Sequence, residues 1–146
     1  MKKLVGLVGI MLLMVSVACA RDKVTQDVSL LPTEARDMIK TYFPKAMVSY
    51  LKVDKHFFRT EGYDVRLSDG TDLEFNTKGQ WTEVECHPQA VPAKLIPESI
   101  RKYVGRYYGD QQVKKIKHNR RGYELKLSNG LEVEFDNMGN FLRLDD

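Results

Sequence analysis

The sequence contains one twenty-residue segment twice, sixty residues apart and without a gap. Residues 62–81, GYDVRLSDGTDLEFNTKGQW, align with residues 122–141, GYELKLSNGLEVEFDNMGNF, and eight of the twenty positions are identical. Most of the other pairs keep charge or apolar character, so the chain carries a duplicated supersecondary unit. The retained residues are glycines, apolar residues and turn formers, which build a sheet and supply no nucleophile, metal-ligand set or phosphate-binding loop. The duplication therefore predicts architecture and does not name a substrate or partner.

The two copies also share a predicted helix upstream of this segment. Residues 35–44 align with residues 100–109 at a spacing of sixty-five, and apolar side chains recur there every three to four positions. Pro44 and Gly109 end these helices, because proline and glycine both interrupt a helix. The first copy is five residues longer between its helix and its Gly-Tyr, and most of the excess falls in residues 54–61. A longer and more aromatic hairpin is therefore expected in the first copy.

Each copy then shows the alternation of a half-buried sheet. Apolar side chains alternate with charged ones over residues 63–75 and again over residues 123–135. The Asp-Gly at positions 69–70 and the Asn-Gly at positions 129–130 accept the positive φ of tight hairpin turns. Each unit is thus predicted to be one helix followed by four antiparallel strands, which places the chain in the α+β class.

The amino terminus has the features of a secretory signal peptide over residues 1–20. Two lysines precede an apolar run, and Ala18, Cys19 and Ala20 form a small-residue cleavage site. Two processing routes remain open: Ala18 and Ala20 fit ordinary signal peptidase, whereas the residues up to Cys19 resemble a lipobox, which would lipidate Cys19. Either route exports the protein to the periplasm or cell envelope, and it would meet a membrane only if Cys19 were lipidated.

The mature chain is expected to consist of a flexible segment, residues 21–29, and two repeats, residues 30–87 and 88–146, that form one compact domain. Without the signal peptide it carries 21 basic and 20 acidic residues. A net charge of +1 gives no general attraction for nucleic acid. Cys86 is the remaining thiol once Cys19 is removed or lipidated, so no intramolecular disulfide is expected.

The motifs of the repeat resemble those of the PepSY-like, β-lactamase-inhibitor-like exported proteins of Bacteroidetes. The resemblance rests on the order of helix and meander, the Gly-Tyr-x-Val/Leu-x-Leu-Ser-Asp/Asn-Gly core and the x-Glu-Phe-Asn/Asp-x-x-Gly turn, and it covers residues 30–146. It implies two helix-plus-four-strand units whose sheets join into one eight-stranded concave surface with the helices on its back. It also implies a protein-binding or inhibitory role without an established reaction. The chain lacks the cysteines that give the β-lactamase inhibitor protein a disulfide in each half.

Aromatic side chains near the ends of the two repeats are the first candidates for a binding site. If Val84, Leu142 and Leu144 face the core, Trp81 and Phe141 lie on the solvent-facing, concave side of the sheet. Aromatic residues among charged ones are typical of protein-binding surfaces. The alternative is that both aromatics cover the edge of the core, because a one-residue bulge would reverse their face. The charged residues predicted to flank them on the binding surface are Asp64, Arg66, Glu74, Glu83, Lys126, Glu134 and Arg143.

Two further aromatic residues, Phe57 and Phe58, lie in the longer hairpin of the first copy. Adjacent side chains in a strand point to opposite faces, so at least one is expected to be exposed or to cover the sheet edge. They are a candidate partner contact, and the alternative is packing beneath the hairpin.

No catalytic residue, metal-ligand set or cofactor site is predicted. Cys86 and His87 are adjacent in a predicted strand, so their side chains diverge, and no further ligand cluster accompanies them. The segments 69–72 and 136–139 lack the ligand spacing of a calcium loop and are interpreted as hairpin turns.

The favoured function is a non-enzymatic exported binding protein, whose concave sheet binds or inhibits an extracytoplasmic protein by steric occlusion. The second hypothesis is a carrier or sensor of a small ligand or peptide, in a pocket between the sheet and the helix that bears Tyr103, Tyr107 and Tyr108. An enzyme is least supported, because the three histidines have no partners at catalytic spacing. The expected partner is an exported or cell-envelope protein, with no nucleic acid and no cofactor.

Overall fold

The protein is described here by a computed structural model covering residues 22–57 and 59–145. Two α-helices, α1 (Thr33–Tyr42) and α2 (Glu98–Tyr107), and two short 3-10 helices, η1 (Val28–Leu30) and η2 (Ala93–Leu95), accompany nine strands. The strands are β1 (Lys23–Thr25), β2 (Val48–His56), β3 (Arg59–Leu67), β4 (Asp72–Asn76), β5 (Trp81–Glu85), β6 (Val113–Asn119), β7 (Gly122–Leu127), β8 (Glu132–Asp136) and β9 (Phe141–Asp145). The predicted signal peptide, with Cys19, lies outside the described residues.

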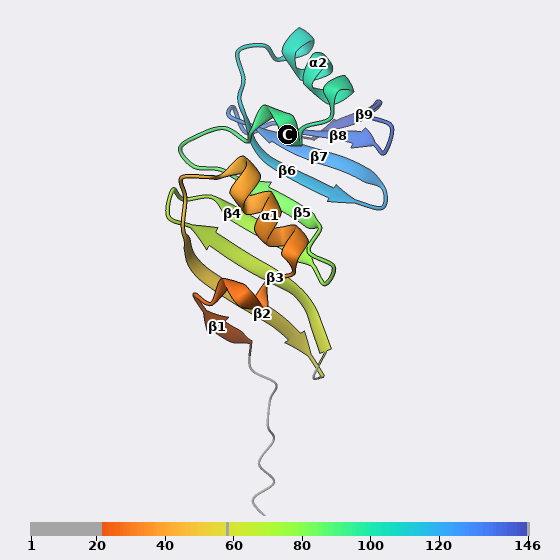
Figure 1. Cartoon of the computed structure of the whole chain (residues 1–146). Helices are drawn as coiled ribbons and strands as arrows, with labels where there is room; N and C mark the ends of the chain where they lie inside the picture. The colour runs from red at the N-terminus through yellow and green to blue at the C-terminus, as the bar shows by residue number, and fades with distance from the viewer. Residues whose placement is uncertain (1–21, 58, 146) are drawn as a thin grey trace, which may run out of the picture.

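The nine strands form one antiparallel sheet in chain order, from β1 to β9. Figure 1 shows the strands following one another along the molecule, with α1 lying across the first repeat and α2 beside the second. The predicted α+β duplication is confirmed, and the pairing of β5 with β6 makes the sheet continuous from one repeat to the other. Within the described residues, no helix is long and apolar enough to cross a membrane.

The sheet has one strand more than predicted, because residues 23–25 form β1. This strand pairs with β2 and lies within the segment that the sequence predicted to be flexible. Asp22 binds Lys52 with 3.1 Å between the carboxylate oxygen and Nζ, and Gln26 donates a hydrogen bond to the carbonyl of Ser49. These contacts fix the segment against the edge of β2.

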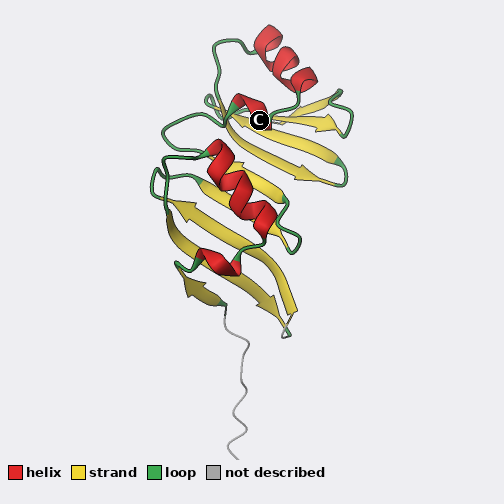
Figure 2. Ribbon diagram, in the orientation of Figure 1, coloured by secondary structure: helices red, strands yellow, loops and turns green. Residues whose placement is uncertain are grey.

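The helices (red in Figure 2) pack on one face of the sheet and enclose a single core. The predicted apolar stripes of α1 and α2 are both buried there, with Ala35 and Ile100 fully inaccessible. Opposite them, one row of apolar side chains crosses the sheet in register, and each is 2% exposed or less: Leu51, Val65, Leu73, Val84, Ile116, Leu125 and Val133. Burying each such side chain contributes about 1.5–3 kcal/mol to folding, so the row binds the two repeats into one unit.

The Gly-Tyr of each repeat is retained because the glycine packs against the neighbouring strand. A Cβ atom on Gly122, whose φ is +142°, would lie 2.0 Å from the carbonyl oxygen of Phe135. A Cβ on Gly62 would lie 2.7 Å from the carbonyl oxygen of Phe75. Only glycine allows this close approach of two backbones.

A β-bulge in each repeat determines the face of the candidate aromatic residues. Glu74 pairs with Glu83 but Phe75 pairs with Trp81, so Thr82 is the extra residue. The same shift pairs Phe135 with Phe141 in the second repeat. Trp81 and Phe141 therefore lie on the helix side with the core, and the expectation that they stand on the solvent-facing side is wrong.

Candidate functional site

The face of the sheet opposite the helices, here called the open face, carries a continuous line of charged side chains. Strand register places one residue from each of eight strands in this line, which we call the charged row: Lys52, Asp64, Glu74, Glu83, Lys117, Glu124, Glu134 and Arg143. Five of these residues, Asp64, Glu74, Glu83, Glu134 and Arg143, were predicted from the sequence to flank or form the binding surface. The other predicted pair, Arg66 and Lys126, lies one row away on the same face, where Arg66 binds Asp72 at 2.7 Å and Lys126 approaches Glu132 at 3.9 Å.

The charged row places like charges directly opposite one another. In the first repeat Asp64, Glu74 and Glu83 are consecutive neighbours across three strands, and in the second repeat Glu124 faces Glu134. Like charges directly opposite in a sheet destabilise it by about 0.2–1 kcal/mol per pair. The arrangement therefore costs stability, and packing of the fold does not require it.

Only some of these carboxylates have a cation. Lys115 binds Glu83 at 2.5 Å, and Arg143 binds Glu134 at 2.6 Å. Among residues 22–57 and 59–145, Glu74 and Glu124 form no ion pair. Glu74 and Glu124 thus differ from Glu83 and Glu134, each of which has an ion-pair partner.

The pKa values of two carboxylates in the first repeat are raised by partial burial and by neighbouring carboxylates. The pKa of Glu74 is raised above its ordinary value, first by partial burial of the carboxylate and then by the charges of Glu83 and Asp64. The pKa of Asp64 is raised by partial burial and then by Asp54. Glu74 lies in a shallow hollow of about 490 Å³ on the open face, which Tyr50, Asp64 and Glu83 also line. Carboxylates outnumber the one cation, Arg66, in the lining of the hollow, which gives it a negative charge.

Replacing Glu74 by glutamine is expected to stabilise the protein at neutral pH by about 0.2–1 kcal/mol, because it removes like-charge repulsion. A carboxylate whose folded pKa is raised contributes stability at low pH and loses it as the pH rises through that pKa. The gain should therefore vanish below about pH 4, where the glutamate is itself protonated. Thermal unfolding of the wild type and the variant across this pH range measures the effect.

Glu134→Gln is the matched control for that prediction, since it lies in the same row but removes the ion pair with Arg143. It should leave stability unchanged or lower it. A lower unfolding temperature for Glu74→Gln at neutral pH would contradict the assignment of Glu74 as a strained, unpaired carboxylate.

Phe57 is not part of the charged row. It forms the turn between β2 and β3, where it has a φ of 45°, is 79% exposed and sets its ring edge-on to that of His56 at 4.3 Å between centroids. Five residues separate it from Lys52, or about 16 Å along a strand. Its exposure agrees with the sequence-based expectation, and Phe58 lies outside the described residues.

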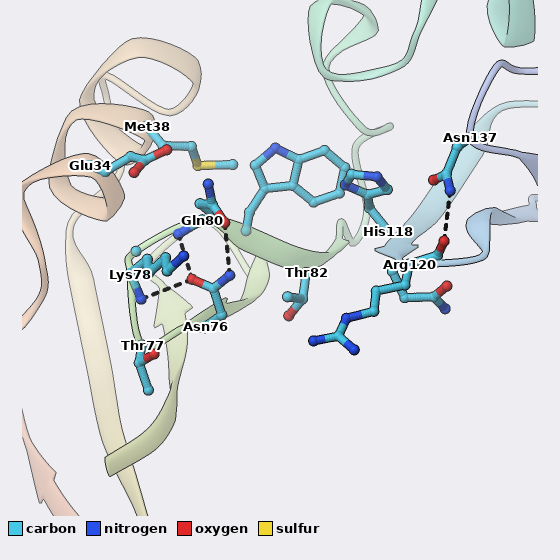
Figure 3. A pocket seen from close by; sticks show the side chains of 13 residues that line it. Glu34, Met38, Asn76, Thr77, Lys78, Gln80, Thr82, His118, Arg120 and Asn137 are labelled. Atoms are coloured by element: carbon cyan, nitrogen blue, oxygen red, sulfur yellow. Dashed lines mark hydrogen bonds between the residues drawn. The ribbon is translucent and has the colours of Figure 1, made fainter.

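The helix side holds a second hollow, a cleft of about 950 Å³ at the junction of the repeats. Figure 3 shows Glu34 and Met38 of α1 on one side, the turn bearing Lys78 and Gln80 beneath them, and His118 on the other side. Trp81 also lines this cleft. The cleft thus lies against α1, whereas the sequence placed a possible pocket against α2.

The aromatic side chains of the helix side pack against one another. The Trp81 ring lies 5.8 Å from that of His118, and His118 stacks on Tyr123 at 4.3 Å. In the second repeat Tyr103 stacks on Phe141 at 5.1 Å. Both aromatic candidates therefore cover the edge of the core, the alternative that the sequence had left open.

The residues capable of nucleophilic or metal chemistry are dispersed. Cys86 is buried, and burial raises the pKa of its thiol, while His87 points to Glu85 with 2.9 Å between Nε2 and Oε1. No group of three or more His, Cys, Asp or Glu side chains in the described part of the chain could hold a metal ion.

Three residues of the charged row, Lys52, Lys117 and Glu124, were not among the sequence candidates. The sixty-residue repeat aligns Glu124 with Asp64, so the alternation contained the signal for Glu124. Lys117 could not be placed from the sequence, because its position opposite Glu83 depends on the register between β5 and β6.

A family described as "Putative beta-lactamase-inhibitor-like, PepSY-like" matches residues 61–143, which include most of the charged row and both Gly-Tyr motifs. The chain belongs to this family. Its PepSY-like fold is also seen in a "putative periplasmic protein of unknown function" from Bacteroides vulgatus, which is 49% identical, covers 86% of this chain and all of its own, and superposes with a TM-score of 0.82.

Two more solved structures are similar to this PepSY-like chain. A "putative periplasmic protein" of the DUF2874 family from Bacteroides vulgatus is 41% identical over 88% of this chain and 99% of its own, with a TM-score of 0.79. A "putative calcium-regulated periplasmic protein" from Bacteroides thetaiotaomicron is 38% identical over 86% and 97%, with a TM-score of 0.80. A comparison with proteins of curated function finds no match. The predicted export is confirmed by these relatives, and the protein is periplasmic.

Proposed function

We propose that this PepSY-like protein is a non-enzymatic binding module that uses its open face to bind, and sterically block, another exported or cell-envelope protein. The observation that carries the proposal is the charged row, in which Glu74 lies between Asp64 and Glu83 and Glu124 lies between Lys117 and Glu134. Neither Glu74 nor Glu124 has an ion-pair partner in the described residues. A sheet that keeps repulsive, unpaired carboxylates sacrifices stability, which is typical of functional surfaces.

The spacing of the two carboxylates indicates how far apart the cationic groups of a partner would be. Glu74 lies on β4 and Glu124 on β7, three strands apart, or about 14 Å across the sheet. A protein that presents two arginine or lysine side chains at this separation would neutralise both carboxylates at once. Arginine suits the hollow at Glu74 better, because its planar guanidinium binds a carboxylate through two hydrogen bonds. With five carboxylates and three cations, the charged row would not favour nucleic acid.

A binding role also accords with the chemistry of the rest of the chain. Cys86 is inaccessible and holds its proton, and His87 is engaged with Glu85. Neither has the nucleophile-to-base contact that covalent catalysis uses.

The second candidate function is a carrier of a small ligand or peptide in the helix-side cleft. The observation that favours it is Trp81, which lines this cleft beside His118 and Met38. Such a ligand would be held by aromatic and apolar contacts, so its binding would depend on Trp81 and little on salt.

Cross-linked capture from the producing cell's envelope extract separates the two functions. We expect the wild-type mature protein to capture a partner that Glu74→Gln/Glu124→Gln loses and Trp81→Ala retains, because the two glutamines remove the free charges of the open face. The captured protein should carry an exposed cluster of arginine or lysine. Capture lost by Trp81→Ala and retained by the glutamine variant would instead assign binding to the cleft.

A further inference from the structure

Strand β9 ends the sheet in the described part of the chain and leaves apolar side chains exposed. Leu144 continues the buried apolar row, next to Val133, yet it is 42% exposed, and Leu142 is 54% exposed. The equivalent of Leu144 in the first repeat, sixty residues earlier, is Val84, which is completely buried because β6 lies beside it. Leu144 is therefore exposed because no strand lies beside β9 in the described residues, and not because of its residue type.

The opposite edge of the sheet is built differently. β1 has three residues and begins with Lys23, and Asp22 beside it binds Lys52. β1 exposes a single large apolar side chain, Val24, whereas β9 exposes Phe141, Leu142 and Leu144. Short, charged edge strands protect a sheet from association. β9 has five residues, and its edge position exposes Leu142 and Leu144. An edge of this kind is suited to pairing with another strand.

The junction between the repeats shows which strand fits such an edge. Val84 on β5 pairs with Ile116 on β6, and this apolar pair is flanked by Glu83 opposite Lys117 and by Glu85 opposite Lys115. The flanking charges form ion pairs, with Lys117 at 3.5 Å from Glu83 and Lys115 at 3.2 Å from Glu85. A central apolar pair between two opposite-charge pairs is therefore the pattern that closes this fold's own junction.

We propose that β9 pairs antiparallel with β9 of a second copy of this chain, on a two-fold axis at Leu144. In this register Leu144 faces the partner's Leu144, Arg143 faces the partner's Asp145, and Asp145 faces the partner's Arg143. The strand is thus complementary to itself in the same pattern as the junction, apolar in the centre and oppositely charged on both sides. Arg143 binds Asp145 of its own strand at 3.3 Å, and in the dimer it would also face the partner's Asp145. A register centred one residue earlier would place Arg143 against the partner's Arg143 and is disfavoured.

The main chain supports the same register. The amide of Cys86 donates to the carbonyl of Lys114 on β6 at 2.8 Å. Because main-chain groups alternate in direction along a strand, the amide and carbonyl of Val84 also point to β6. By the sixty-residue repeat, those of Leu144 point to the free edge. A pair centred on Leu144 would therefore exchange two hydrogen bonds with its symmetry mate.

The dimer would join two sheets into one. A two-fold axis perpendicular to the sheet keeps both sets of helices on one side and both open faces on the other. The two charged rows would then lie on a single surface, and a partner with repeated cationic sites could bind both. The pairing itself does not depend on the proposed function.

Cysteine cross-linking of the mature protein tests the register. Leu144→Cys should form a covalent dimer under mild oxidation, because the two Cα atoms would be about 5.5 Å apart, within disulfide range. Leu142→Cys is the matched control on the same strand, since its symmetry mate would be about 13 Å away and should not react. Light scattering should show a dimer of the wild type at high concentration.

A charge exchange provides a second readout. Arg143→Asp should weaken dimerisation about tenfold or more by placing two acidic pairs in the interface, and Arg143→Asp/Asp145→Arg should restore it. A strictly monomeric wild type would overturn the proposal. So would a covalent dimer of Leu142→Cys without one of Leu144→Cys, or growth of open-ended polymers, which would indicate pairing of β9 with the other edge of the next copy.

Discussion

Replacing Ile116 by alanine is expected to lower the free energy of unfolding by about 2–5 kcal/mol, the cost of a cavity at a fully buried site. Ile116 is completely inaccessible and pairs with Val84 across the junction of the two repeats. Because residues of both repeats belong to one core cluster, the whole chain should still unfold in a single transition at lower temperature. Calorimetry combined with circular dichroism measures both the loss and the number of transitions.

Leu51→Ala is the matched control, since Leu51 is the counterpart of Ile116 in the first repeat and is equally buried. It should cost a similar amount without lying at the junction. Two separate transitions in Ile116→Ala, with one at the wild-type temperature, would show that the repeats are independent domains.

Reversing the two unpaired charges, Glu74→Lys/Glu124→Lys, is expected to weaken partner binding on the order of 100-fold, or about 2.7 kcal/mol. Each substitution removes an attraction for a cationic side chain and replaces it with a repulsion. Titration calorimetry at low and high salt measures the effect, and the loss should shrink as salt screens both charges.

A control variant with the same change of net charge distinguishes the effect of the charged row on binding from the effect of the protein's net charge. Glu98→Lys/Asp110→Lys places the new charges on α2 and in the turn after it, away from the open face. It should bind nearly as well as the wild type. Equal weakening by both variants would show that binding responds to net charge and not to the charged row.

The architecture was predictable because the sequence repeats it. The alternation over residues 63–75 and 123–135 correctly separates core from solvent in β3, β4, β7 and β8. The helix stripes were also right, since three-and-four spacing fixes the buried face of α1 and α2. The additional strand, β1, was missed because its three residues are too few to show a pattern. It joins the sheet by main-chain pairing with β2.

The candidate site was harder to predict than the fold. Trp81 and Phe141 changed face because one extra residue, Thr82 or Leu142, shifts the register after a strand that otherwise alternates. Nothing local in the sequence marks that extra residue. Alternation alone places the acidic residues on the open face, and all those of the charged row except Glu124 were among the candidates. Their arrangement in one row required the pairing of β5 with β6.

Carboxyl footprinting of the protein, free and bound to its captured partner, tests the central claim most directly. Carbodiimide labelling read by mass spectrometry reports Glu74 and Glu124 on the open face and Glu34 in the helix-side cleft within one experiment. We expect Glu74 and Glu124 to lose their label in the complex while Glu34 keeps it. Protection of Glu34 with unchanged labelling of Glu74 and Glu124 would contradict the open face as the binding surface.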